Sequence, residues 1–334
     1  MRNPTICFAV LNYNGQGHLR ELLPTLLEAV RHYPHDCPIV ILDNQSTEGD
    51  VTWLTRNYPS VDVVVAPSDD YLFSYNWLLP QRKEDIVILL NNDVRVSPNL
   101  IGILARHFNE PTTFAVSCKA FTWDGLHVNS GPCTFDARRG WLKAEYAFSR
   151  QRTSYTLFPG GACIAVDRLK FLALGGFDRL FYPAYGEDKD LGFRAWCKGW
   201  KCIYEPNCHI FHREGGTWDV NEGTAEGGGS RPAALIERTN YFFMWRNLRH
   251  STFRLNHAVY LSWLICRKTA ERDVRWLNAF REARQLWKQR RGNALRNSPE
   301  RISLSALRQI CGSPVVEPRF SEEPSITSEE SLKK

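Results

Sequence analysis

Four short apolar runs, each ending in polar residues, dominate the first hundred positions: Thr5–Leu11, Pro38–Asp43, Val61–Ala66 and Asp85–Leu90. The segment Leu19–Val30, which follows the first run, repeats leucine and alanine at helical spacing. Nearly continuous Val, Ile and Leu runs are typical of parallel strands that are covered on both faces. Strands that alternate with helices form βαβ units. We therefore predict an α/β fold whose first half contains a mostly parallel sheet.

Polar residues follow three of these predicted strands where each strand ends. They are Asn12-Tyr13-Asn14, Asp43-Asn44 and Asn91-Asn92-Asp93. Ligands bind beyond the carboxyl ends of parallel strands, so we expect the three clusters to converge on one binding edge. The sequence contains neither G-x-G-x-x-G after the first strand nor G-x-x-x-x-G-K-[ST]. This argues against dinucleotide oxidoreductases and P-loop enzymes.

Asp93 is a candidate metal ligand, because it closely follows the five apolar residues Ile86–Leu90. A carboxylate at a strand end can hold a divalent ion that neutralises a diphosphate. The alternative is that Asn-Asn-Asp merely caps a turn.

A second acidic cluster, Tyr185–Asp190, opens the predicted helix Glu187–Lys198. Acidic residues at a helix N-terminus can simply complement the helix dipole. A carboxylate beside a sugar-binding cleft can instead remove the proton from an attacking hydroxyl. The helix-dipole explanation does not account for the preceding segment Gly175–Asp178. Both explanations remain open at this point.

The middle of the chain, from Phe114 to about Thr217, is predicted to mix helices and strands. Two short strands, Lys201–Glu205 and Cys208–Phe211, are expected around a Pro-Asn turn. His209 and His212 would then alternate faces and not share one metal. A zinc site is not expected, because no common structural zinc pattern matches the spacing of Cys202, Cys208, His209 and His212.

Six motifs in this order resemble the family 2 inverting glycosyltransferases, and most closely their bacterial rhamnosyltransferase-like branch. The resemblance extends from about Thr5 to Asn247, where Glu237–Tyr241 matches a recurrent segment. The motifs are Asn12-Tyr13-Asn14-Gly15, Asp43-Asn44-Gln45-Ser46, Asn92-Asp93, Gly160-Gly161-Ala162, Gly175-Gly176-Phe177-Asp178 and Glu187-Asp188-x-Asp190-Leu191, followed by His212.

The resemblance implies a GT-A fold, with a Rossmann-like nucleotide-binding half and a mixed acceptor half. It also implies an inverting transfer of sugar from a nucleoside-diphosphate sugar to an acceptor hydroxyl, in cell-surface polysaccharide or lipid-linked glycan synthesis, with bound Mg²⁺ or Mn²⁺. Tyr13 and Asp43 match positions that contact the nucleotide base. The other residues assigned to donor binding are Asn12, Asn14, Asn76, Asn91 and Asn92.

The same resemblance assigns the remaining site residues. Asp93 matches the last residue of the metal-binding D-x-D motif, and His212 completes the metal or diphosphate site. Asp188 matches the catalytic base and Glu187 shapes the acceptor site beside it. Gly161 and Asp190 are placed on the acceptor side.

Two positions depart from the family pattern. Asn91 stands where the metal motif usually has Asp, so one ligand charge is missing. Leu72 replaces the glycine of a segment that resembles N-x-G-F-x-x-N, and its larger side chain is expected to reshape the donor pocket.

The charge divides the chain into two parts. Residues 231–300 contain fifteen Lys or Arg and five Asp or Glu, so this stretch has a net charge of about +10. The whole chain has a net charge of +6, and the rest of the chain is therefore near −4. We predict a catalytic domain at 1–230 (donor half 1–112, acceptor half 113–230), a helical basic arm at 231–311 and a disordered tail at 312–334. The arm interleaves aromatic and basic residues, which suits either packing on the catalytic domain or binding to an anionic membrane.

Ten scattered cysteines without a C-x-x-C pair, several in apolar runs (Cys7, Cys163 and Cys266), indicate reduced thiols in the core of a cytosolic protein. The first residues lack the parts of a signal peptide, and no apolar stretch is long enough to span a bilayer. We expect a cytoplasmic location, with the inner face of the membrane open as a docking place. The expected partners are the sugar donor and a glycan or lipid-linked acceptor, and nucleic acid is not expected. A nucleotidyltransferase and a non-catalytic basic binding protein remain alternatives.

Overall fold

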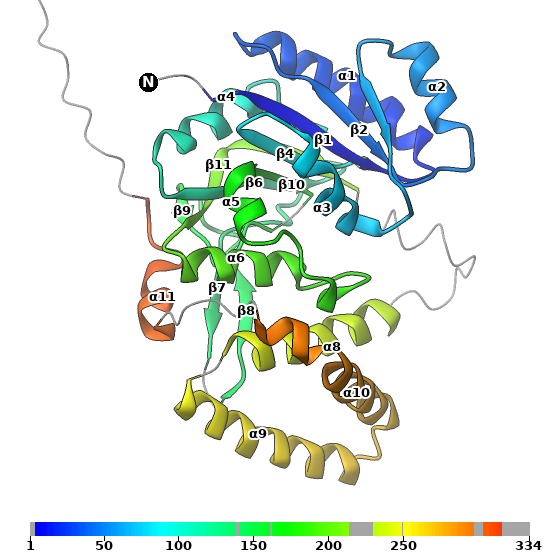
Figure 1. Ribbon diagram of the computed structural model, residues 1–334. Helices are drawn as coiled ribbons and strands as arrows, with labels where there is room; N and C mark the ends of the chain where they lie inside the picture. Colours follow the sequence, from blue (N-terminus) through cyan, green and yellow to red (C-terminus); the bar gives the residue numbers. More distant parts are fainter. Residues whose placement is uncertain are drawn as a thin grey trace, which may run out of the picture.

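The computed structural model describes residues 4–137, 140–160, 162–213, 230–248, 250–296 and 303–315. Its centre is a nine-stranded sheet in the order β3-β2-β1-β4-β10-β6-β11-β5, with β9 paired to β11 (Figure 1). The strands of this sheet are β1 (Ile6–Asn12), β2 (Ile39–Asp43), β3 (Asp62–Val65), β4 (Ile86–Asn91), β5 (Val94–Val96), β6 (Thr113–Thr122), β9 (Ser154–Tyr155), β10 (Cys163–Asp167) and β11 (Lys201–His212).

The first four strands form the parallel part that the sequence predicts. β1 pairs in parallel with β2 on one side and with β4 on the other, and β3 continues the sheet beyond β2. The helices α1 (Gln16–His32) and α2 (Asp50–Asn57) lie between these strands in the chain, and Figure 1 shows them beside this part of the sheet. The carboxyl ends of β1, β2 and β4 therefore meet at one edge, as expected for parallel strands.

The side chains of β4 show why its sequence is apolar throughout. Ile86, Ile88 and Leu90 belong to the core on the side of α1, while Val87 and Leu89 belong to the core on the opposite face. Successive side chains of a strand point to opposite faces, so a strand covered on both sides has no polar positions.

The remaining strands make the mixed half. β10 lies between β4 and β6 and is antiparallel to both, whereas β11 is parallel to β6. A separate hairpin of β7 (Cys133–Asp136) and β8 (Lys143–Tyr146) stands below the sheet in Figure 1. The helices of this half are α4 (Leu100–Ala105), α5 (Arg168–Ala173) and α6 (Glu187–Cys197).

Residues 201–212 form one strand instead of the two short strands predicted around a turn. β11 pairs with β6 before and after an irregularity between Glu205 and His209. The Glu205 side chain closes this bulge, because its Oε1 accepts hydrogen bonds from the backbone N and Nδ2 of Asn207 at 2.8 and 2.7 Å. The Pro-Asn pair that indicated a turn thus forms a bulge inside a continuous strand.

Glu205 is 0% exposed and is held by groups from two other segments of the chain. Its Oε2 accepts hydrogen bonds from Arg106 Nη2 at 2.8 Å and Thr153 Oγ1 at 3.1 Å, and lies 2.7 Å from His107 Nε2. Burial alone would raise the pKa of Glu205, but these hydrogen bonds outweigh it and lower the pKa to about 2. The ionised carboxylate therefore stabilises the fold.

Replacing Glu205 by glutamine is expected to lower the free energy of unfolding by about 3 kcal/mol, because the new amide would face buried donors. Urea denaturation at neutral pH measures this loss. The contribution of Glu205 is fully present above its ordinary pKa of 4.5 and is lost as the pH falls toward 2, so the two proteins should converge in acid.

The control is Glu145→Gln, which removes the exposed pair of Glu145 with Lys143 (2.7 Å). Exposed pairs contribute about 0–1 kcal/mol, so little change is expected. Equal losses in the two variants would contradict the role assigned to Glu205.

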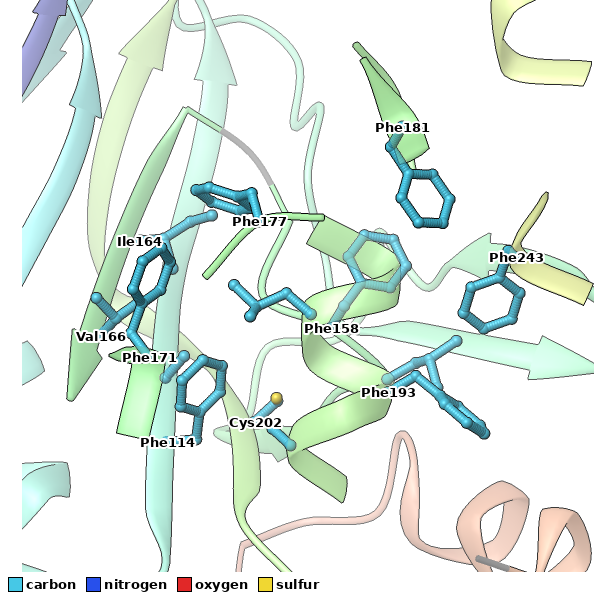
Figure 2. Packing of buried hydrophobic residues seen from close by; sticks show 14 of the residues in the cluster. Phe114, Phe158, Ile164, Val166, Phe171, Phe177, Phe181, Phe193, Cys202 and Phe243 are labelled. Carbon is cyan, nitrogen blue, oxygen red and sulfur yellow. The ribbon is translucent and has the colours of Figure 1, made fainter. Parts of the chain in front are cut away.

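The basic arm forms four helices: α8 (Ser230–Asn247), α9 (Ser251–Ala270), α10 (Val274–Arg296) and α11 (Leu304–Ile310). Most of the arm's aromatic residues pack inward and join the core that covers one face of the sheet. Figure 2 shows this core from Ile164 and Val166 of β10 to Phe193 of α6 and Phe243 of α8. The rings of Phe193 and Phe243 meet edge to face at 5.5 Å. No helix of the described residues has both the length and the apolar character needed to cross a membrane.

Two expectations about the periphery were wrong. Cys266 is exposed on α9, although eight of the ten free cysteines are buried as predicted. The tail was predicted to start at 312, yet residues 312–315 run along β9. There Tyr155 N donates to Ser313 O at 2.9 Å, and Val315 N donates to Thr153 O at 3.1 Å. Residues 316–334 lie outside the described residues.

Candidate active site

A cavity of about 550 Å³ opens at the carboxyl ends of β1 and β4 and reaches the N-terminus of α6. It is therefore bordered by both halves of the sheet. Eight of the residues selected from the sequence line it: Tyr13, Asn14, Asn91, Asn92, Asp93, Glu187, Asp188 and His212. Segments up to about 200 positions apart in the chain thus contribute to one site.

Asn12 and Asp43 lie at the ends of β1 and β2 and do not line the cavity. Both are fully buried, and Asn12 Nδ2 donates to Asp43 Oδ2 at 3.0 Å and to Asp50 Oδ2 at 2.9 Å. Asp43 also accepts from the backbone N of Ser46 at 2.8 Å, which fixes the loop after β2. These two residues hold the loops from which Tyr13 and Asn14 project, and their assignment to donor binding stays a prediction.

Gly15 is required by the close packing of these loops. A Cβ at position 15 would lie 2.1 Å from Asn92 Nδ2 and 2.5 Å from Asn12 Oδ1. Asn92 Nδ2 donates to Asn12 Oδ1 at 2.8 Å, which joins the end of β4 to the end of β1. The motif Asn-Tyr-Asn-Gly therefore has a physical basis in the contact between two strand ends.

Asn76, also assigned to donor binding, joins two backbone segments instead. Its Nδ2 donates to Phe177 O, and its Oδ1 accepts from Phe177 N, both at 2.8 Å. A Cβ on Gly176, which has a φ of +68°, would lie 2.2 Å from Asn76 Oδ1. Leu72 does line the cavity, in accordance with the expectation that it shapes the donor pocket.

Asp93 and His212 lie close together and both line the cavity. Asp93 lies between β4 and β5, and the antiparallel pairing of β5 with β11 places Val94 opposite His212. The Oδ1 of Asp93 lies 3.5 Å from His212 Nε2. Asp93 is only 5% exposed, and this oxygen has no hydrogen-bond partner among the described residues. A buried carboxylate oxygen without a donor, next to an imidazole, is suited to a divalent cation.

Glu187 and Asp188 begin α6. The turn before them is tight, with left-handed conformations at Tyr185 (φ +72°) and Gly186 (φ +82°). Both carboxylates line the cavity, and Asp188 Oδ1 accepts from the backbone N of Lys189 at 2.6 Å. The Oε2 of Glu187 has no hydrogen-bond partner among the described residues. These acidic side chains therefore face the cleft in addition to standing at a helix N-terminus.

Burial raises the pKa values of both Glu187 and Asp188, and their neighbours affect the two groups differently. Burial raises the pKa of Asp188, and the Lys189 backbone hydrogen bond and ammonium charge partly oppose this rise. Burial also raises the pKa of Glu187, and the negative charge of Asp188 raises it further. The Lys189 contacts thus favour Asp188 as the carboxylate of the pair, and its negative charge favours the protonated form of Glu187. A pair of this kind provides one proton acceptor and one neutral hydrogen-bond donor.

Two neighbours of this pair were not selected from the sequence. Lys189 is buried, donates from Nζ to Asn240 Oδ1, and lies 5.0 Å from the ring of Phe243. Tyr146 comes from the β7–β8 hairpin, and its hydroxyl occupies the space that a Cβ on Gly160 would enter at 2.6 Å. Lys189 could have been noticed within Glu-Asp-Lys-Asp, whereas no sequence signal connects Tyr146 with the site.

Asp190 lies outside the cavity, contrary to its assignment to the acceptor side. It is 0% exposed and accepts hydrogen bonds from Arg194 Nε at 2.7 Å and Asn247 Nδ2 at 2.8 Å. Arg246 Nη1 lies 3.3 Å from Asp190 and also pairs with Asp178. Asp190 therefore fastens the start of α6 to α8 of the arm.

Gly161 lies outside the described residues. His209 is separated from His212, and its ring packs 5.5 Å from that of Phe121. Within the described part of the chain, no group of three or more His, Cys, Asp or Glu side chains is arranged to hold a metal.

Sequence comparisons extend these observations. A model of the glycosyltransferase-like family 2 matches residues 4–226. The chain is 26% identical over 260 residues to the O-antigen biosynthesis protein RfbC of Myxococcus xanthus, a match that covers 74% of this chain and 18% of that protein. It is also 26% identical over 237 residues to the N-acetylglucosaminyl-diphospho-decaprenol L-rhamnosyltransferase of Mycobacterium tuberculosis, covering 61% of this chain and 74% of that enzyme. The chain thus spans only a small part of the first relative.

Solved structures resemble the fold. S. aureus TarS 1-349 in complex with UDP-GlcNAc superposes with a TM-score of 0.54 and 14% identity, covering 84% of this chain and 81% of that one. The mannosyltransferase PcManGT from Pyrobaculum calidifontis, in complex with GDP-Man and Mn²⁺, gives a TM-score of 0.52 and 16% identity, covering 92% and 79%. At these identities the likeness concerns the fold alone.

Proposed function

Because the chain belongs to the glycosyltransferase-like family 2, we propose that it transfers a sugar from a nucleoside-diphosphate sugar to an acceptor hydroxyl with inversion. The family match and the structural neighbours confirm the resemblance and the GT-A fold predicted from the sequence. They favour a glycosyltransferase over the nucleotidyltransferase and the basic binding protein that the sequence left open. The rhamnosyltransferase among its relatives supports the branch named there.

One observation carries the proposal. A single cavity is lined by Asp93 and His212 from the β5–β11 side, by Glu187 and Asp188 from the start of α6, and by Tyr13 and Asn14 after β1. The first pair suits a diphosphate with its cation, and the second suits a hydroxyl that must lose a proton. Donor and acceptor groups can therefore meet in the space between them.

In the proposed reaction, Asp188 accepts the proton of the acceptor hydroxyl as its oxygen attacks the anomeric carbon. The leaving nucleoside diphosphate departs from the opposite side, so the anomeric configuration inverts. Glu187 keeps its proton and can donate a hydrogen bond to the acceptor. Lys189 favours the ionised form of Asp188 by its charge. Tyr13 and Asn14 position the nucleotide at the end of β1.

We further propose that Asp93 and His212 hold Mg²⁺ or Mn²⁺, with Asn91 and Asn92 nearby at the strand end. The Oδ1 of Asp93, which accepts no hydrogen bond from the described residues, is the observation that supports this assignment. A bound divalent ion would offset the negative charge that builds on the departing diphosphate. Asn91 supplies a neutral oxygen where the family motif has a carboxylate, so the protein contributes one charge less.

Replacing Asp93 by asparagine is expected to weaken Mn²⁺ binding by at least about tenfold, because the charged ligand is lost. Calorimetric titration of Mn²⁺ into the protein, with and without a nucleotide, measures the affinity directly. Asp124→Asn, in an exposed loop, is the control and should bind as the original protein does. Unchanged affinity in the Asp93 variant would exclude it as a ligand.

The acceptor is proposed to be a lipid-linked or polysaccharide glycan, as the decaprenol-linked substrate in the name of one relative suggests. In this arrangement residues 1–112 bind the donor and residues 113–230 bind the acceptor. The arm at 231–311 supports α6 through Arg246 and Asn247.

A donor panel tests the proposed function. The full chain is mixed with UDP-, TDP- and GDP-sugars plus Mn²⁺ or Mg²⁺, and thermal stabilisation and slow donor hydrolysis are recorded. One donor class should raise the Tm, and EDTA should remove the effect. A chain that responds to no donor and hydrolyses none would contradict the assignment.

A further inference from the structure

The outward face of α9 exposes three large apolar side chains in one line. Leu255 is 66% exposed, Val259 is 65% exposed and Trp263 is 51% exposed. They recur every fourth residue, and side chains at this spacing lie on the same side of a helix. Single exposed apolar residues are normal on a protein surface, but an aligned set of three indicates a contact surface.

The opposite face of α9 already has its partners. Phe253 and His257 are buried, and His257 Nδ1 lies 2.7 Å from Gly140 O. Leu261 and Leu264 pack against the core from the same side. Figure 1 shows α9 at the bottom of the view, at the opposite end from α1 and α2. The helix is therefore anchored on its inner side and free for contact on its outer side.

The charges around the line are positive. From Ser251 to Ala270 the helix contains Arg254, Arg267 and Lys268 and no Asp or Glu, while Glu271, just beyond its end, pairs with Arg267 at 2.7 Å. At 100° per residue, Arg267 lies about 40° beyond Trp263, whereas Arg254 lies about 100° before Leu255, toward the anchored side. Arg267 also lies over the ring of Trp263, 5.4 Å from its centroid. Apolar side chains beside basic ones suit insertion among acidic lipid headgroups.

We propose that Leu255, Val259 and Trp263, on a helix within an arm of net charge about +10, dock the protein on an anionic bilayer surface. This set is called the α9 face. A second copy of the chain fits it less well, because a stable dimer buries roughly 800 Å² on each partner and three partly exposed side chains provide only a part of that.

The α9 face replaces the broader membrane surface suggested by the composition of the arm. Tyr241, Phe243 and Trp276 are buried in the core and cannot reach a bilayer. The docking itself does not depend on the catalytic assignment. Its use in presenting the site to a lipid-linked acceptor does rest on the proposed function.

Vesicle flotation of the full chain tests the docking. The protein is mixed with vesicles made of equal parts phosphatidylglycerol and phosphatidylcholine, or of phosphatidylcholine alone. We expect flotation with the acidic vesicles and a partition coefficient at least about tenfold lower for the variant Leu255→Ser, Val259→Ser, Trp263→Ser. Leu169→Ser changes an exposed leucine of α5 and is the matched control, which should float as before.

A label on Cys266 gives a second readout. This cysteine is exposed on α9, three positions beyond Trp263, whereas eight others are buried. An environment-sensitive fluorophore there should shift to the blue with acidic vesicles. Binding that is equal with neutral vesicles, the absence of binding by the original chain, or self-association abolished by the triple variant without vesicle binding would each overturn the proposal. Donor-induced stabilisation, measured on the same samples, reports separately on the catalytic assignment.

Discussion

Replacing Asp188 by asparagine is expected to lower the turnover number by about 10²–10⁴-fold while donor binding changes little. The variant keeps the size of the side chain but cannot accept the proton of the acceptor hydroxyl. It should also be at least as stable as the original chain above neutral pH. Burial raises the pKa of Asp188, so the folded state disfavours its ionised form, and the neutral amide removes that cost. Activity is measured as sugar transfer or donor hydrolysis, and stability as Tm.

Glu187→Gln is the matched comparison for this prediction. It removes a proton that we expect to stay on the side chain, so it should reduce turnover far less than Asp188→Asn does. The pH profile adds a further criterion, since activity should fall as the pH drops below the raised pKa of Asp188. If the glutamine variant is the inactive one and Asp188→Asn keeps most of its turnover, the roles of the two carboxyl groups must be exchanged.

The parallel half of the fold could be predicted because its strands are covered on both faces. Ile86–Leu90 consists of apolar residues alone, and such a run leaves few alternatives to a central strand. The polar residues directly after it then mark the binding edge without further information. The single strand β11 could not be predicted in the same way. Pro206 and Asn207 have the local signature of a turn, and only pairing with β6 on both sides of the bulge keeps the strand continuous.

The candidate site was predictable where residues stand at strand or helix ends and less so where burial decides their role. Asn12 and Asp43 follow the pattern of donor-binding residues. In the structure they are buried, form a hydrogen bond with each other and do not line the cavity. Asp43 and Ser46 have the spacing of a local side-chain turn, which was a usable signal. Tyr146 does not line the cavity, but burial and the charges of Asp188 and Glu187 raise its pKa, so it lies near this pair. Its place in a distant hairpin depends on tertiary structure alone.

The aromatic residues of the arm illustrate the same limit. Tyr241, Phe242, Phe243 and Met244 are consecutive and all buried, which requires α8 to be covered on nearly every side. Composition alone could equally have placed them on a membrane surface. Of the side chains that remain exposed on α9, Trp263 belongs to the aromatic residues noted in the arm, whereas Leu255 and Val259 were not singled out from the sequence.

Replacing Asp190 by asparagine is expected to lower the free energy of unfolding by about 3–5 kcal/mol. Arg194 and Arg246 would then face a neutral group in a site that is closed to water. Burial raises the pKa of Asp190, but the charges of the two arginines outweigh it, and the net pKa is lowered. The stabilisation is therefore present above the ordinary pKa of an aspartate and is lost as the pH falls. Urea denaturation at neutral and at acidic pH measures both effects.

Asp188 and Asp190 are two positions apart on α6, about 200° around the helix, and this explains why similar residues have opposite effects. One faces the cavity and the other faces α8, so Asp188→Asn should cost activity and Asp190→Asn should cost stability. Combining Asp190→Asn with Arg246→Met should destabilise less than the sum of the single changes, because both belong to one network. At low temperature the folded Asp190 variant should keep measurable turnover, since its side chain does not reach the cleft. A fully folded Asp190 variant without activity would instead place this residue in the catalytic machinery.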